Sequence, residues 1–287
     1  MTPATQPRPA TQERKELLLF TLAVLGLTTV IIATLHQLHV TNNWAANALM
    51  FVPGSVAIAL LLRSGTGVRS IGWGTGPAIY WFWAIALPVI ALAMSLPISI
   101  WLGFAALAPA STKMGALASQ PLKILENVLI YTAISIPFAL GEEIGWRGYA
   151  QGRLVRQFGL LKGFLLLGLI WGFWHSPIYY FMGTDTAHPI LGPFVMTPID
   201  NILAVVPMAW LYIRSRNICV PTFMHAFADV LWGFSGLLFP ASNETATWAI
   251  LQATQVVISA VLLRSLMAKP AEAAALAFKP LPVPESG

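Results

Sequence analysis

The sequence contains little charge: Asp, Glu, Lys and Arg make up 9% of its 287 residues. A soluble domain carries about a quarter charged residues, so this composition excludes an ordinary soluble globular protein. Hydrophobic residues make up 57% of the chain instead. They fall in runs of about 20 residues, the length that crosses a bilayer. The chain is therefore predicted to be an all-α, polytopic membrane helical bundle.

Cysteine is nearly absent as well, because Cys219 is the single one in the sequence. One thiol cannot form an internal disulfide framework, and it is too little for a cysteine-based metal site. The formal net charge of +5 does not indicate a nucleic-acid partner. The cations stand at the ends of the apolar runs, where they set the orientation of a membrane protein.

Eight transmembrane helices are predicted from the apolar runs. No cleavable signal peptide is expected, because the first run is too long for a signal core and no small-residue cleavage site follows it. Residues 1–15 are predicted to be a cytoplasmic tail, 16–267 the transmembrane domain and 268–287 a flexible cytoplasmic tail. The predicted spans lie at about 17–35, 45–62, 78–104, 122–148, 160–182, 195–213, 218–239 and 246–266.

Lysine and arginine are distributed unevenly between alternate connections. Fourteen of them fall on one side, and the other side receives only Lys113 and Lys123. Cytoplasmic loops carry the excess of these residues, so both termini are predicted to be cytoplasmic. With no targeting features evident, we expect a multi-pass protein of the plasma membrane, specifically a prokaryotic inner membrane.

Ionisable side chains inside the spans cluster in three of the eight helices. Such a side chain costs at least about 2.5–3.5 kcal/mol at the bilayer centre, so it usually faces a cavity or a partner and marks function. The fourth span ends with two adjacent glutamates and an arginine, and the fifth and seventh each carry a histidine. These residues are Glu142, Glu143, Arg147, His175, His225 and Asp229.

The depths of these side chains predict that they meet. At a rise of 1.5 Å per residue, Glu142 and His225 each lie about 12 Å from the cytoplasmic end of their helix, and His175 about 18 Å. Glu143 and Arg147 are four residues apart and share a helix face, so they are expected to pair. Glu142 points elsewhere and remains available.

Two kinds of chemistry suit this cluster. A buried glutamate beside two imidazoles can act as a general base on a water that neighbouring donors hold in place. Two histidines and a carboxylate are also a known zinc-ligand combination, so zinc bound by Glu142, His175 and His225 stays open. A transporter or proton relay would use buried Glu and His side chains too.

The order and spacing of three motifs resemble those of a known family. The motifs are Glu-Glu-x-x-x-Arg at 142–147, aromatic-x-x-x-His at 171–175 and His-x-x-x-Asp at 225–229. They resemble the CPBP family of intramembrane proteases, which includes CAAX prenyl protease 2 and the bacteriocin-processing (Abi) proteins. The resemblance covers about 121–235, which would be the protease core, within an eight-helix background like that of the family.

The resemblance implies an endopeptidase of the CAAX-processing type, historically labelled a metalloprotease, that cleaves near the cytoplasmic side of the membrane. Glu142 and His175 would then activate the attacking water, and His225 with Asp229 would stabilise the oxyanion. Glu143 and Arg147 would hold the shape of the site, and Trp171 stands where the family typically has Phe. Asp229 stands where prenyl-protein proteases tend to have Asn. An ionised carboxylate cannot donate a hydrogen bond, so Asp229 would instead orient His225.

The expected partner is a membrane-anchored or prenylated peptide or protein, within the lipid bilayer. A non-proteolytic bacteriocin-immunity or peptide-binding protein remains the alternative. Other intramembrane proteases fit less well. The His-Glu-x-x-His motif of site-2-type metalloproteases is absent, and the rhomboid-like Gly-x-Ser-Gly at 233–236 has no histidine after it.

Overall fold

The computed structural model describes residues 10–40, 43–183 and 187–276, and it confirms the all-α prediction. In that part of the chain the regular structure is helical, apart from one isolated bridge between Ala105 and Ala241. The elements are α1 (Ala10–Gln37), α2 (Asn43–Ala48), α3 (Phe51–Arg63), η1 (Val68–Ile71), α4 (Ala78–Trp101), α5 (Lys113–Ala118), α6 (Pro121–Gly145), η2 (Trp146–Gln151), α7 (Gly152–Phe158), α8 (Leu160–Met182), η3 (Gly192–Met196), α9 (Thr197–Ser215), α10 (Cys219–Leu238), α11 (Glu244–Met267) and α12 (Pro270–Leu276).

All eight predicted spans are helical, but they are not equally suited to cross a bilayer. Among the described residues, six helical segments are long and apolar enough to do so, and they include α1, α4, α8 and α11. The predicted second span is divided into α2 and α3, and α3 has only 13 residues. Helix α10 also falls outside the six. Helix α4 is unbroken although it contains Pro88 and Pro97.

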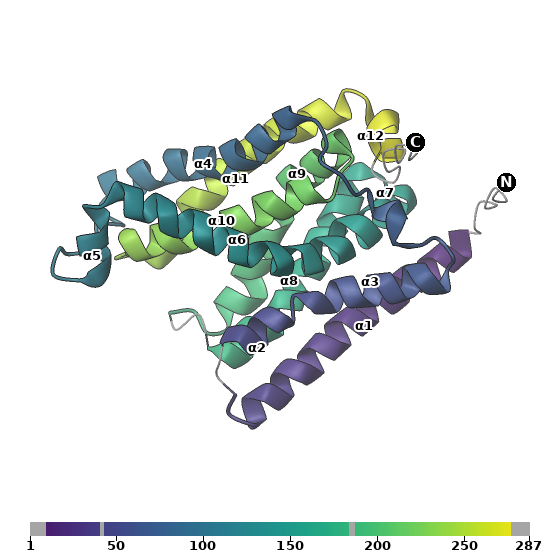
Figure 1. Cartoon of the computed structure of the whole chain (residues 1–287), viewed down its shortest axis with the longest axis horizontal. Coiled ribbons are helices and arrows are strands. Elements are labelled where there is room, and N and C mark those ends of the chain that lie inside the picture. Colours follow the sequence, from purple (N-terminus) through teal and green to yellow (C-terminus); the bar gives the residue numbers. More distant parts are fainter. Residues whose placement is uncertain (1–9, 41–42, 184–186, 277–287) are drawn as a thin grey trace.

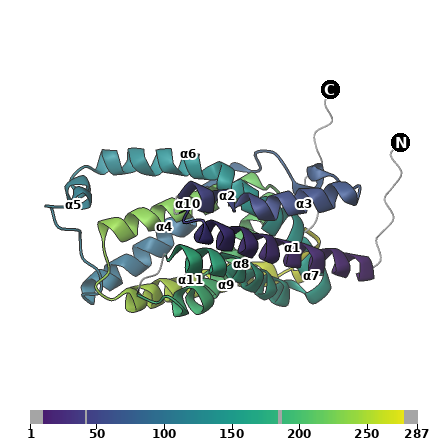
Figure 2. The same cartoon turned by 90° about the horizontal axis from the view of Figure 1, so that it is seen from below.

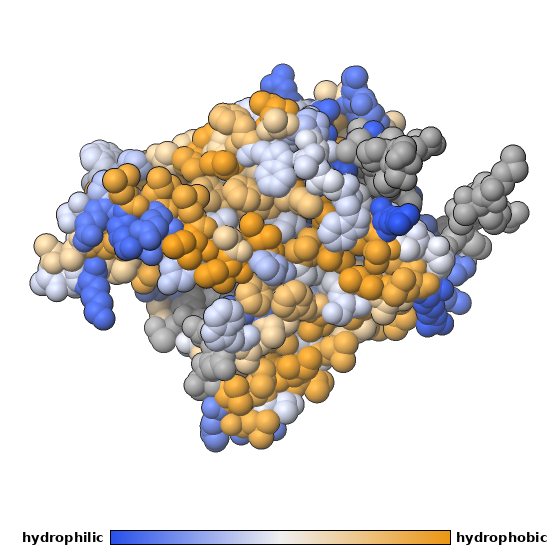
Figure 3. Space-filling model, in the orientation of Figure 1, coloured by the Kyte–Doolittle hydropathy of each residue, from blue (hydrophilic) through white to orange (hydrophobic). Residues whose placement is uncertain are grey.

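The cation-rich helix ends gather at one end of the bundle. Helix α1 begins there, α3, α9 and α11 end there, and α7 and α12 lie beside them (right-hand side of Figure 1). Helix α5 lies at the opposite end, and the view from below shows the same separation (Figure 2). Hydrophobic side chains cover much of the visible face, and hydrophilic ones gather towards its ends (Figure 3). The gathering of the cation-rich helix ends at one end of the bundle agrees with the uneven distribution of lysine and arginine in the sequence.

Small residues bring the site-bearing helices into close contact with their neighbours. A Cβ added at Gly145 of α6 would lie 2.7 Å from the carbonyl carbon of Pro53 in α3. A Cβ added at Gly172 of α8 would lie 3.1 Å from the ring of Pro198 in α9. Glycine at such positions lets helix backbones approach closely inside a membrane. Helices α6 and α8 are thereby held at fixed places around the site.

Both expected tails contain helix. Helix α1 begins at Ala10, and α12 occupies 270–276, where it packs against α7, α8 and α9. Ala273 of α12 is buried in the hydrophobic core. The rest of the two expected tails, 1–9 and 277–287, lies outside the described residues.

Candidate active site

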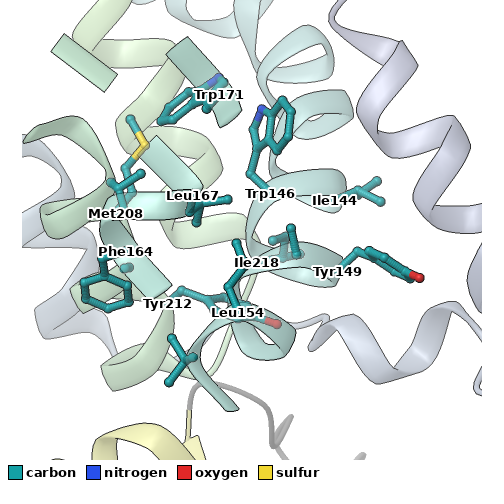
Figure 4. Close-up of a cluster of buried hydrophobic side chains, with 14 of the residues drawn as sticks. Ile144, Trp146, Tyr149, Leu154, Phe164, Leu167, Trp171, Met208, Tyr212 and Ile218 are labelled. Atoms are coloured by element: carbon teal, nitrogen blue, oxygen red, sulfur yellow. The ribbon is translucent and has the colours of Figure 1, made fainter. Parts of the chain in front are cut away.

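Two adjacent glutamates stand at the end of α6, where the α-helix changes into the π-helical turn η2. Glu142 and Glu143 are both fully buried. The wider π-helical turn starts at Trp146, and such turns occur frequently at functional sites. Tyr149 belongs to this turn, and Leu154, Ile218 and other apolar side chains pack beside it (Figure 4). The glutamates are therefore enclosed at the cation-rich end of the bundle.

Glu142 is oriented by two tryptophans. Its Oε2 accepts hydrogen bonds from Nε1 of Trp171 at 2.6 Å and from Nε1 of Trp146 at 3.0 Å. The other oxygen, Oε1, is buried and has no hydrogen-bond partner among the described residues. A buried polar atom without a partner is costly, and Glu142 lines a cavity. One oxygen of the carboxylate is thus fixed, and the other is free to bind a ligand or a water.

Glu143 forms the ion pair with Arg147 that their spacing predicts, and it has a second partner that the spacing does not predict. Its Oε1 accepts from Arg147 Nη1 at 3.1 Å and lies 2.9 Å from Nδ1 of His225. Arg147 also stacks 4.4 Å over the ring of Trp171 and donates to Met208 Sδ at 3.0 Å. Glu143 therefore joins α6 to α10.

His225 lies between two carboxylates. An ionised carboxylate only accepts hydrogen bonds, so Nδ1 of His225 donates to Glu143. On the other side, Nε2 lies 3.5 Å from Oδ2 of Asp229, whose side chain is 50% exposed. This distance is at the outer limit of a hydrogen bond. Nε2 is therefore loosely engaged, and it lies on the side of the cavity that His225 and Asp229 both line.

His175 is held by aromatic rings. It stacks on Tyr179 with ring centroids 5.3 Å apart and meets Trp174 edge-to-face at 4.6 Å. Its Nδ1 lies 3.2 Å from the carbonyl oxygen of Trp171, which can only accept. The proton therefore sits on Nδ1, and Nε2 is left as an acceptor.

These side chains surround one cavity of about 640 Å³, lined by Glu142, His175, His225 and Asp229 among others. Helices α6, α8 and α10 thus bring these side chains together, as their predicted depths in the membrane indicate. The lining continues from these side chains to Met182 at the end of α8 and to Asp200 in the first turn of α9. The buried η2 turn and α7 close the cation-rich end.

The zinc alternative does not fit this arrangement. Zinc ligands must converge on one point at about 2.0–2.2 Å. Within the described ranges, no three His, Cys, Asp or Glu side chains are placed to hold a metal ion. Glu142, His175 and His225 do not form a ligand set.

Several contributors to the cavity were not among the residues selected from the sequence. Trp146 is not among the residues selected from the sequence, and it donates a hydrogen bond to Glu142. A polar wall formed by Asn201, Trp232, Gln252 and Gln255 was not anticipated. Two glutamines within one apolar helix are the signal that would have found it, because polar side chains in a membrane usually face a cavity or a partner.

Comparison with known proteins gives a match over the part of the chain that builds this site. Residues 124–231 match the family described as Type II CAAX prenyl endopeptidase Rce1-like. The CAAX prenyl protease 2 of Methanococcus maripaludis is 30% identical over 80 residues. That alignment covers 26% of this chain and 29% of the relative, so the chain matches under a third of the length of this curated protein. The family match spans all three motifs.

Proposed function

Because residues 124–231 match the family described as Type II CAAX prenyl endopeptidase Rce1-like, we propose that this chain is an intramembrane endopeptidase of the CPBP family. It hydrolyses a peptide bond at the cavity with a water that Glu142 and His175 activate. The observation that carries this proposal is the unpartnered Oε1 of Glu142, which belongs to a carboxylate fixed by two indole donors on the wall of a cavity.

The first step is the attack of water on the scissile carbonyl. The water donates one hydrogen bond to Oε1 of Glu142 and the other to Nε2 of His175. Glu142 takes a proton as the oxygen–carbon bond forms, which leaves a tetrahedral intermediate with a negative oxygen. Trp146 and Trp171 keep the carboxylate oriented during this transfer, so little reorganisation is needed.

The second step is the collapse of the intermediate. His225 donates a hydrogen bond from Nε2 to the oxyanion, while its Nδ1 remains bound to Glu143. The carbon–nitrogen bond then breaks, and protonated Glu142 returns its proton to the departing nitrogen. The products are a carboxylic acid and an amine, and transfer of the acid proton to the amine gives a carboxylate and an ammonium group. Glu143 and Arg147 act through His225, and Asp229 holds Nε2 until the oxyanion forms.

The substrate follows from the family and from the surroundings of the site. The protein is multi-pass, with helices long and apolar enough to cross a membrane. A prenylated or otherwise membrane-anchored peptide would enter along the cavity and place its scissile bond in the cytoplasmic half of the bundle. We place the protein in the plasma membrane of a prokaryotic cell.

The test uses purified protein in proteoliposomes with a synthetic peptide ending in S-farnesyl-Cys-Val-Ile-Met. Wild-type protein is expected to release the tripeptide, and Glu142→Gln is expected to release none although it folds and inserts normally. A Glu142→Gln variant that retains full activity would refute water activation by Glu142. Binding of the peptide with no cleavage by the wild-type protein would favour the non-proteolytic alternative.

A further inference from the structure

Three helices present one face each to the outer part of the cavity. On α10, Trp232 follows His225 and Asp229 at helical spacing, and on α11 the positions 248, 252 and 255 share a face. On α9, Asp200 and Asn201 line the same space. Trp232 stands seven residues after His225, which corresponds to about 10 Å along the helix. This wall therefore extends the site away from the reacting groups.

The wall contains an unused donor and an unused acceptor. Within the part of the chain that the structure describes, Nε1 of Trp232 is buried and has no hydrogen-bond partner, and the same holds for Oε1 of Gln252. Gln252 as a whole is only 7% exposed. Buried polar groups in folded proteins are nearly always paired, so two orphans on one cavity wall point to a ligand that supplies both partners.

The chemistry of the two orphans identifies the kind of ligand. An indole N–H needs an acceptor, and an amide oxygen needs a donor. A peptide main chain offers both in every residue, whereas a hydrocarbon chain offers neither. A length of about 10 Å accommodates about three residues of extended chain.

We infer that Trp232 and Gln252 form a subsite for the main chain of the substrate, in which Trp232 donates to a substrate carbonyl and Gln252 accepts from a substrate N–H. The subsite recognises an extended peptide of about three residues next to the scissile bond, whatever its side chains are. Its role in cleavage rests on the proposed peptidase function, because it positions the chain whose bond Glu142 would hydrolyse.

The experiment measures binding in the full-length Glu142→Gln protein in detergent, so that cleavage plays no part. The probe is a fluorescent peptide ending in S-farnesyl-Cys-Val-Ile-Met, together with depsipeptides in which one N–H at a time is replaced by an ester oxygen. The additional variants are Gln252→Met, which keeps the length of the side chain, and Trp232→Phe, which keeps an aromatic ring without the N–H donor. Their matched controls are Thr254→Val and Trp210→Phe, which lose buried or half-buried hydrogen bonds away from the cavity.

Gln252→Met and Trp232→Phe are each expected to raise the Kd by about 3- to 10-fold, as the loss of one hydrogen bond does. One depsipeptide is expected to bind the Glu142→Gln protein more weakly than the amide, and this difference should vanish when Gln252→Met is added. The two controls should bind as tightly as the Glu142→Gln parent, and an unfolding measurement on each variant identifies losses caused by misfolding.

Unchanged Kd values in both subsite variants would overturn the inference, and so would an ester effect that persists in Gln252→Met. The absence of binding by every variant would also overturn it. Failure of the proposed peptidase activity gives a different pattern, in which the wild-type protein does not cleave the peptide but Gln252→Met still weakens binding. If the wild-type protein cleaves the peptide and both variants bind it with an unchanged Kd, the subsite is refuted and the proposed peptidase function stands.

Discussion

Nε1 of Trp171 in α8 donates to Oε2 of Glu142 in α6 over 2.6 Å. Because this bond connects two helices and leaves Oε1 free, it determines how the carboxylate faces the cavity. Trp171→Phe removes the donor and keeps an aromatic ring beneath Arg147. We expect kcat to fall about 10-fold or more, since misplacement of a catalytic group is costly, with KM little changed. The check is to measure the kinetics of Trp171→Phe together with those of the control Trp210→Phe, which replaces a tryptophan outside the cavity. A normal kcat for Trp171→Phe would contradict this role.

The two glutamates are predicted to respond differently to neutralisation. Glu143→Gln leaves the buried Arg147 without its counter-charge, and breaking a buried pair costs about 3–5 kcal/mol. Glu142 forms no such pair with any described residue, so Glu142→Gln should abolish activity without a comparable loss of stability. Thermal unfolding of the two variants in the same detergent separates the effects. Equal unfolding temperatures would show that Glu143 does not stabilise the junction of α6 and α10.

Asp229 is predicted to be replaceable by asparagine. Its side chain is half exposed and its contact with His225 Nε2 is long, at 3.5 Å. The amide of asparagine still accepts from that N–H, and it can also donate to an oxyanion. We expect Asp229→Asn to retain activity within about 10-fold of wild type and Asp229→Leu to lose more, because leucine offers no hydrogen bond. If leucine and asparagine behave alike, the role assigned to Asp229 is wrong.

The approach of α3 to α6 is predicted to be essential for the site. A Cβ added at Gly141 would lie 2.7 Å from the backbone oxygen of Met50, so Gly141→Ala should destabilise by about 1–3 kcal/mol through overpacking and lower activity. A Cβ added at Gly233 in α10 would have no described atom within 4 Å. Gly233→Ala is therefore the matched control, and helix propensity favours it by about 1 kcal/mol. Equal unfolding temperatures for the two variants would contradict this packing.

The sequence predicted the helices and the depths of the buried charges, because apolar run length and helical rise are local properties. It did not predict which glutamate contacts His225. Glu142 and Glu143 differ by one position along α6, and only the packing of Gly141 and Gly145 against α3 decides which side chain faces which neighbour. The π-helical turn that follows adds a rotation that no helical periodicity anticipates.

The sequence also does not predict how far the cavity extends or which of its ends is closed. Lys and Arg counts orient the ends of helices, but they do not report which end is packed shut. Apolar side chains such as Leu154 and Ile218 close the cation-rich end, and their burial is a tertiary property. Gln252 and Gln255 lie on a helix that carries no motif, so their position beside the site depended on how α11 packs against α9 and α4.

The central claim is that Glu142 activates a water for attack on a peptide bond. The most direct measurement is cleavage of the farnesylated peptide in water enriched in oxygen-18, with mass spectrometry of the new carboxyl group. Wild-type protein is predicted to incorporate one heavy oxygen per cleavage, and Glu142→Gln to give no product in the same time. Cleavage by Glu142→Gln at the wild-type rate, with the same incorporation, would contradict the account.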